Sequence, residues 1–275
     1  MSRPAGMRAF MIVWAGQVLS LLGSAMTQFA LTIWAYERTG SATALALVAF
    51  FGFGPALLFS PIAGALVDRW NRKLVMMISD LGGGVATIVI LILYASGQLE
   101  IWHLYITSAI WGVCNAFQWP AFSAAITLML PKKQYARANG LMGLADSAAN
   151  VFAPIFASVL LVVIGVGGIM IIDIVTFVFA VGALALIFVP QPQVTTPEGA
   201  AKTSLWKDSI FGFRYILKRP SLLGLQLTFF FINLTGSFCV VLAAPMVLAR
   251  TGNSEAALAT VQSVGAVGGI VGGVL

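Results

Sequence analysis

Charged residues are scarce in this chain. Asp, Glu, Lys and Arg make up 9% of its 275 residues, whereas about 25% is usual for soluble domains. Hydrophobic residues make up 60%, and they come in runs of about 20 residues or more, the length that crosses a bilayer as a helix. The composition excludes an ordinary soluble domain and predicts an all-α integral membrane protein with several spans.

Residues that carry enzyme chemistry are also few. The only histidine is His103, and the two cysteines, Cys114 and Cys239, lie in apolar runs with no other Cys or His at metal-ligand spacing. The sequence has no His-Glu zinc motif, no Gly-x-Ser-x-Gly nucleophile elbow and no Gly-x-x-x-x-Gly-Lys phosphate-binding loop. These absences argue against a membrane-embedded enzyme and against an ATP-driven pump, and we expect neither a metal nor a cofactor.

Eight spans are predicted from the apolar runs, at about 10–36, 43–67, 74–95, 101–129, 139–164, 167–189, 221–248 and 256–275. All of the 15 cations except Arg38 and Arg250 fall at the N-terminus or in links that follow an even-numbered span. Cytoplasmic loops carry the excess of Lys and Arg, so we expect the N-terminus on the cytoplasmic side of the plasma (inner) membrane. The net charge of +6 is then a topology signal and does not indicate a nucleic-acid partner.

One predicted link is much longer than the others. It begins with a proline-rich stretch and continues with Ser204 to Leu217, which can form a short helix with an apolar side and a basic side. Such a helix typically lies on the membrane surface. We therefore expect a six-helix bundle over 1–190, a cytoplasmic linker over 191–220 and the start of a second bundle over 221–275.

The link between the second and third spans carries a dense charge motif. Residues 64–73 read Gly-Ala-Leu-Val-Asp-Arg-Trp-Asn-Arg-Lys, which is the pattern G-x-x-x-D-R-x-x-R-K. This motif resembles the loop between the second and third helices of the major facilitator superfamily of secondary transporters. The resemblance implies two bundles of six helices each, so the chain is expected to be an N-terminal fragment with about 8 of 12 spans. The last predicted span ends at Leu275 without flanking charges.

The resemblance also implies a cytoplasmic gating role for the motif. In the family, the position of Asp68 holds the second helix against the eleventh in the outward-facing state. Arg69 and Arg72 occupy the positions that complete this charge network, and Gly64 and Lys73 complete the motif.

Within the superfamily, the likeness is strongest to the drug:proton antiporter branch that includes macrolide-efflux proteins. The stretches that carry it are Phe53-Gly54-Pro55, Ser60 to Gly64, Trp119-Pro120-Ala121, Leu130 to Gly140 and Phe211 to Pro220. Two features depart from that branch. The fourth span has no arginine, and Ala153 to Ser158 is only a small-residue version of the Gly-Pro-x-x-Gly-Gly element.

Three carboxylates lie within predicted spans: Asp80, Asp146 and Asp173. Ionisable groups in membrane spans are expensive and normally face a cavity or a partner. Asp173 and Asp146 are the proton-coupling candidates, although each could instead fix packing through hydrogen bonds. For Asp80 and Asp146, which lie near the cytoplasmic face, structural pairing with a nearby Arg or Lys is the favoured alternative.

Uncharged polar residues provide candidates for the substrate pathway. The first span places five of them on one helical face, because they follow one another at intervals of three, four, three and one: Gln17, Ser20, Ser24, Thr27 and Gln28. Asn115 and Gln118 in the fourth span and Asn233 in the seventh extend the set. The alternative is that these residues only form hydrogen bonds between helices, which average about 0.6 kcal/mol each.

The sequence therefore predicts a secondary active transporter that exports amphiphilic, macrolide-like small molecules by alternating access, driven by protons. The expected partners are the lipid bilayer, the substrate and protons, and the full-length protein is expected to be a monomer. Alternatives are a siderophore or lysophospholipid exporter and a transport-inactive fragment that needs a partner chain. A membrane-embedded enzyme is the least favoured.

Overall fold

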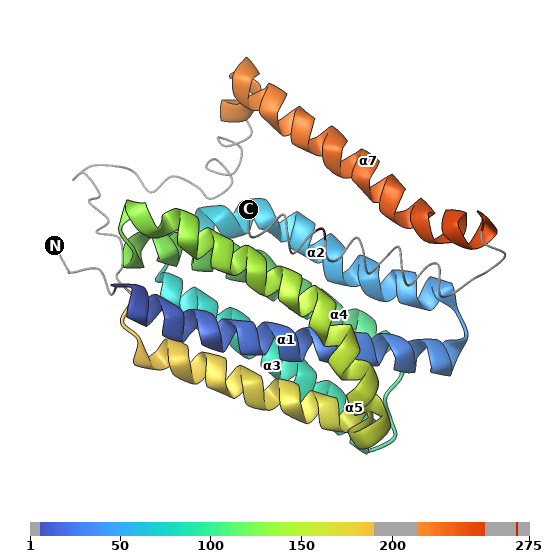
Figure 1. The fold of residues 1–275 in the computed structure, drawn as a ribbon. Helices are drawn as coiled ribbons and strands as arrows, with labels where there is room; N and C mark the ends of the chain where they lie inside the picture. Colours follow the sequence, from blue (N-terminus) through green and yellow to red (C-terminus); the bar gives the residue numbers. More distant parts are fainter. Residues whose placement is uncertain (1–5, 190–213, 251–267, 269–275) are drawn as a thin grey trace. The chain divides into compact units, whose positions relative to one another are not determined.

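The computed structural model describes residues 6–189, 214–250 and 268, and these residues form helices and turns without any strand. Figure 1 shows the helices, numbered along the chain. Their bounds are α1 Gly6–Thr39, α2 Ala42–Arg69, α3 Arg72–Ala95, α4 Ile101–Met129, the 3-10 turn η1 Lys132–Gln134, α5 Tyr135–Leu186 and α7 Pro220–Arg250.

The helices have the length and composition of membrane spans. The 34 residues of α1 rise about 51 Å along the helix axis, against a hydrocarbon core of about 30 Å. Four segments of the described chain are long and apolar enough to cross a membrane: Gly6–Thr39, Thr43–Val67, Arg72–Ala95 and Lys132–Leu186. The helix α4 is not among these four.

The predicted count of about eight spans is not confirmed. The fifth and sixth predicted spans lie in one assigned helix, α5. The eighth predicted span, 256–275, and the linker helix up to residue 213 lie outside the described residues.

Gly165 divides α5 into two halves. Its backbone has φ 67° and ψ −178°, which is not helical, and only glycine adopts this region readily. Figure 1 shows the chain turning back at this point, so that the second half returns along the bundle. The break falls between the predicted fifth and sixth spans, which end at 164 and begin at 167.

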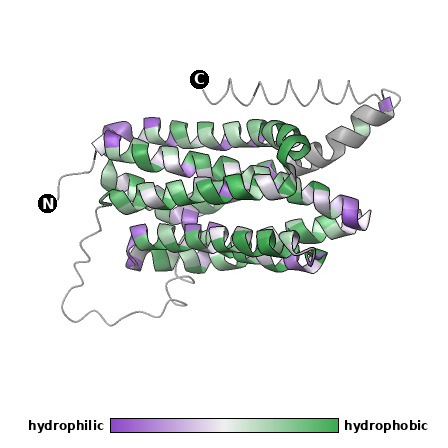
Figure 2. Cartoon of the chain, turned by 90° about the horizontal axis from the view of Figure 1, so that it is seen from below, coloured by the Kyte–Doolittle hydropathy of each residue, from purple (hydrophilic) through white to green (hydrophobic). Residues whose placement is uncertain are grey.

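Helix packing brings distant parts of the chain together. The most extensive contact joins α1 to α5, while α4 packs against both α2 and α3. Large apolar side chains, among them Phe53, Leu58 and Val162, remain exposed on the outside of the helices. Figure 2 shows hydrophobic colouring along most of the helix lengths and hydrophilic residues gathered near the helix ends. This distribution suits a bundle that lies in lipid.

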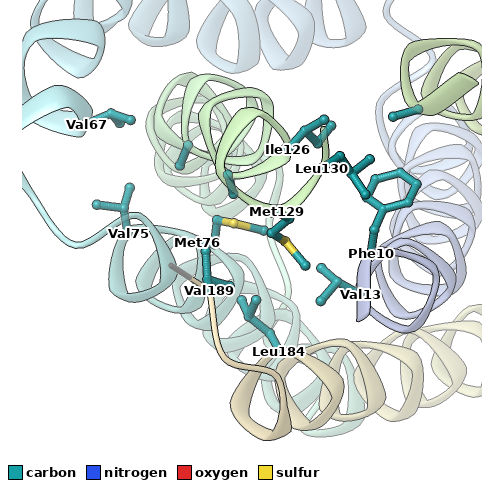
Figure 3. Packing of buried hydrophobic residues seen from close by; sticks show 13 residues of the cluster. Phe10, Val13, Val67, Val75, Met76, Ile126, Met129, Leu130, Leu184 and Val189 are labelled. Carbon is teal, nitrogen blue, oxygen red and sulfur yellow. The ribbon is translucent and has the colours of Figure 1, made fainter. Parts of the chain in front are cut away.

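The interior contains two apolar clusters. The first includes Phe10, Met76, Met129 and Leu184, and Figure 3 shows Met76 and Met129 at its centre. The second includes Met26, Ile90, Leu104, Ala157 and Met170. On α1, α3 and α5 the stretches between these two sets of residues carry polar side chains, so a polar layer separates the clusters.

The charged hinge is a turn of two residues. α2 ends at Arg69, and α3 begins at Arg72 behind Asn71, whose side chain accepts a 3.2 Å hydrogen bond from the amide of Leu74 as an N-cap. Asp68 belongs to the last turn of α2, but its side chain lies outside the described part.

Two compact units divide the chain, residues 1–200 and residues 201–275. The helices α1 to α5 belong to the first unit and α7 belongs to the second.

Candidate functional site

Asp173 lies in the second half of α5 and is only 3% exposed. Its two carboxyl oxygens accept hydrogen bonds from two other helices. Ser24 on α1 donates to Oδ1 at 2.9 Å, and Thr87 on α3 donates to Oδ2 at 3.1 Å. The carboxyl group thus connects three helices at the centre of the polar layer.

Gly23 permits this close approach of α1 to α5. A Cβ atom at this position would collide with the Thr176 hydroxyl and would lie 3.1 Å from both Cα and Oδ1 of Asp173. Even alanine would therefore push α1 away from Asp173 and lengthen the bond from Ser24.

Asp80 is the centre of a second network. Gln17 on α1 donates to its Oδ2 at 2.8 Å, and Gln118 on α4 donates to its Oδ1 at 2.9 Å. The same Gln118 nitrogen also donates to Oε1 of Gln17 at 2.9 Å. Two amides therefore bind one carboxyl group and each other, and they join α1, α3 and α4.

The expected pairing of Asp80 with an Arg or Lys is therefore wrong. Both of its oxygens accept from neutral amides, because α1 and α4 present glutamines at its level while the hinge cations lie at the end of α3. A carboxyl group that two amides already orient inside the bundle needs no cationic side chain for its hydrogen bonds.

The two networks share one cavity of about 110 Å³, which both Asp80 and Asp173 line. Gln17 precedes Ser24 by seven residues, and Asp80 precedes Thr87 by seven, which corresponds to about 10.5 Å along each helix. The networks are thus two levels of the same polar layer, two helical turns apart.

Two further cavities adjoin these levels. One, of about 70 Å³, is lined by Thr27, Gln28, Thr87 and Asp173. The other, of about 220 Å³, is lined by Gln17, Gln118 and Asp146 together with aromatic and aliphatic side chains. The glutamines that bind Asp80 therefore also face the cavity that contains Asp146.

Asp146 differs from the other two carboxylates because it is exposed. Its backbone carbonyl accepts from Asn150 at 2.9 Å. No hydrogen bond from a described residue reaches its carboxyl group, so the alternative of pairing with a nearby cation finds no support for Asp146 in this part of the chain.

The remaining candidate pathway residues belong to different units of the chain. Ser20 and Asn115 line the cavity that contains Asp80 and Asp173, and Asn115 also lines the one that contains Asp146. Asn233 lies on α7, in the other unit, where its amide donates to the carbonyl of Phe229 at 2.8 Å.

Residues of the hinge motif lie at one end of the bundle, away from the polar layer that contains Asp80 and Asp173. Lys73 donates to the backbone carbonyls of Ala185 and Ile187 at 2.8 and 2.9 Å, at the end of α5. Gly64 has open space around it, since no described atom lies within 4 Å of where a Cβ would be. Arg69 and Arg72 flank the turn at the ends of α2 and α3.

Two residues of the site were not selected from the sequence. Thr87 was missed, and Asp80 was set aside as a packing residue. Their spacing of seven along a helix, with Gly83 and Gly84 between them, would have placed them on one face.

Comparison with known proteins identifies the family. The profile of the Major Facilitator Superfamily matches residues 13–275. The chain is 33% identical over 182 residues to macrolide efflux protein A of Streptococcus pyogenes, which covers 66% of this chain and 45% of that protein. It is 32% identical over 164 residues to multidrug efflux pump Tap of Mycolicibacterium fortuitum, covering 57% of this chain and 39% of Tap. The chain therefore belongs to the Major Facilitator Superfamily.

A solved structure shows the same fold. A bacterial homologue of the human lysosomal transporter Spinster, in an inward-facing and unoccupied conformation, superposes with a TM-score of 0.61 at 17% identity. The alignment covers 95% of this chain and 59% of that one. The chain spans about half the length of the curated relatives it matches.

Proposed function

We propose that the protein is a secondary active exporter of amphiphilic, macrolide-like small molecules that works by alternating access and is driven by the proton gradient. The names of the relatives support this class of substrate. The observation that carries the proposal is the polar layer, in which Asp80 and Asp173 line one cavity inside an otherwise apolar bundle. Ionisable groups in such positions mark ion and substrate pathways.

The 220 Å³ cavity suits one part of an amphiphilic substrate. Trp14, Trp119 and Phe122 supply apolar and aromatic surface, while Asp146 supplies a carboxylate at the same cavity. Small-molecule sites combine a mostly apolar lining with a few polar groups that orient the ligand. In this proposal a basic amine of the substrate approaches Asp146 and its apolar body lies against the aromatic side chains.

Proton coupling is assigned in this proposal to Asp173 and Asp146. Asp173 is enclosed and exchanges its proton through the cavities that it lines, whereas Asp146 is open to the 220 Å³ cavity. Competition between a proton and a basic substrate for Asp146 would couple the inward flux of protons to the export of substrate. The hinge motif Gly64, Asp68, Arg69, Arg72 and Lys73 is proposed to form the cytoplasmic gate, with the N-terminus on the cytoplasmic side.

The test is a macrolide accumulation assay in cells that express the complete reading frame containing this chain. We expect expressing cells to accumulate less radiolabelled macrolide than empty-vector cells, and a protonophore to remove the difference. Asp173→Asn should remove proton-driven export, whereas Glu37→Gln, which neutralises an exposed carboxylate near the end of α1, should retain it. Equal accumulation in expressing and empty-vector cells would overturn the proposal.

A further inference from the structure

The oxygen atoms around Asp173 have the composition of a small-cation site. Its carboxyl group meets the hydroxyls of Ser24 and Thr87 at 2.9 and 3.1 Å. A third hydroxyl-bearing residue, Thr27, lines the 70 Å³ cavity together with Asp173. Two carboxyl oxygens and two hydroxyls thus meet from α1, α3 and α5, a third hydroxyl lines the adjoining cavity, and no nitrogen donor from a described residue is among them. Hard cations prefer oxygen ligands of this kind.

Thr27 provides an independent sign of a missing ligand. Its residue is 5% exposed, and its hydroxyl makes no hydrogen bond of ordinary length and angle although it is buried. Buried hydroxyl groups nearly always have a partner. A cation held by Asp173 in the cavity that Thr27 also lines would give the Thr27 oxygen such a partner.

Charge balance points in the same direction. Asp173 lies between two apolar clusters, and no Lys or Arg of the described residues lines either of its cavities. A carboxyl group in such a place must be protonated or, when it is ionised, must be balanced by a cation. One carboxylate balances one positive charge, so a monovalent ion leaves the site neutral, whereas a divalent ion leaves an excess charge in an apolar interior.

The surroundings of the Asp80 carboxyl group differ, because they are not suited to binding a cation. Its two oxygens already accept from the amide nitrogens of Gln17 and Gln118. An amide N–H cannot coordinate a cation, whereas a hydroxyl can donate to the carboxylate or turn its lone pairs to an ion. The two levels of the polar layer therefore differ in chemistry.

We propose that Asp173, Ser24, Thr27 and Thr87 form a binding site for Na⁺, which competes with the proton for the same carboxyl group. This inference deepens the proposed function because it names a second ion that this carboxyl group accepts. The hydroxyls of Ser24 and Thr87 lie within hydrogen-bonding distance of the Asp173 carboxyl group, so the site is small. A small site favours Na⁺ over the larger K⁺. Within the described part of the chain, the other titratable groups of the shared cavity are Asp80 on α3 and Cys114 on α4, and none comes from α1.

The experiment measures ²²Na⁺ binding to the purified full-length protein in detergent, by a scintillation proximity assay. We expect saturable binding that excess unlabelled Na⁺ displaces and equal K⁺ or choline does not. Binding should weaken as the pH is lowered, because protons then occupy Asp173. Asp173→Asn should abolish binding.

Thr27→Val keeps the inference testable if the Asp173 variant does not fold, since it removes an oxygen atom that makes no ordinary hydrogen bond. It should raise the apparent Kd for Na⁺ about tenfold, in the range seen when groups around a bound metal are lost, and Thr27→Ser should restore it. Thr107→Val is the matched control, because the buried Thr107 hydroxyl lines the same 70 Å³ cavity but donates to its own helix at His103, 2.9 Å away.

The outcomes separate this inference from the proposed function. Displacement of ²²Na⁺ by K⁺ as readily as by Na⁺, or a Thr27→Val variant that binds like the wild type, would overturn the sodium site. Proton-driven macrolide export without Na⁺ binding would overturn it too and leave the exporter proposal intact. Specific Na⁺ binding in a protein that exports no macrolide would support the sodium site and overturn the proposed substrate class.

Discussion

The ammonium group of Lys73 lies 2.8 Å from the carbonyl oxygen of Ala185, which is 112 positions further along the chain. A second bond, of 2.9 Å, reaches the carbonyl of Ile187. Lysine is unfavourable in the first turn of α3, where the helix dipole is positive, but favourable at the negative end of α5. One cation of the hinge motif therefore caps a helix and connects α3 to α5.

Replacing Lys73 with methionine should destabilise the first unit. Two carbonyls at the end of α5 lose a charged donor, and bonds to charged groups contribute about 1.5–3 kcal/mol. We expect a clearly lower melting temperature of the purified protein in detergent. Lys133→Met, which removes an exposed cation from η1, should leave it nearly unchanged. Equal melting temperatures for the two variants would show that the cap does not contribute to stability.

The two glutamines that bind Asp80 should behave as one unit. Gln17→Ala or Gln118→Ala leaves one oxygen of a largely enclosed carboxyl group without its donor, which we expect to lower the free energy of unfolding by about 1–3 kcal/mol. The double variant should lose less than the sum of the two, because Gln118 also donates to Gln17. Coupling of about 0.5–3 kcal/mol is typical of such networks. Strict additivity in a denaturation series would contradict the network.

Gly112 should be intolerant of any side chain. A Cβ atom there would collide with the backbone carbonyl of Gly52, where α4 crosses α2. Gly112→Ala must therefore separate these helices, and we expect a fall in stability of about 1–3 kcal/mol, the usual effect of overpacking. Gly182→Ala on α5 is the control, since no described atom lies within 4 Å of the new methyl group. Similar melting curves for both variants would show that α2 and α4 are not in tight contact.

The sequence predicted the bounds of the helices more accurately than the contacts between their side chains. Apolar runs and breaks locate α1 to α5 to within a few residues, because span length and turn residues are local properties. The stripe from Gln17 to Gln28 was also visible, since it repeats along one helix face. Which carboxylates those residues contact was not visible.

The missing information concerns tertiary contacts, which join residues far apart in the sequence. Gln17 and Asp80 stand 63 positions apart, and Ser24 and Asp173 stand 149 apart. Their meeting depends on how α1 packs against α3 and α5, and on the small size of Gly23. The expectation of an Arg or Lys partner for Asp80 was wrong for the same reason, because it considered only its neighbours in the sequence.

The cytoplasmic gate leads to a prediction for Asp68, at the end of α2. In the expressed full-length protein, Asp68→Asn should abolish macrolide export, because the proposed gate depends on a negative charge at the end of this helix. Membrane insertion should remain, since neutralising one residue at the membrane surface changes no span. Export is followed as macrolide accumulation and insertion as the amount of protein in the membrane fraction. Glu37→Gln, which removes an exposed charge near the end of α1, should retain export. Normal efflux from the Asp68 variant would mean that this carboxylate does not hold the gate.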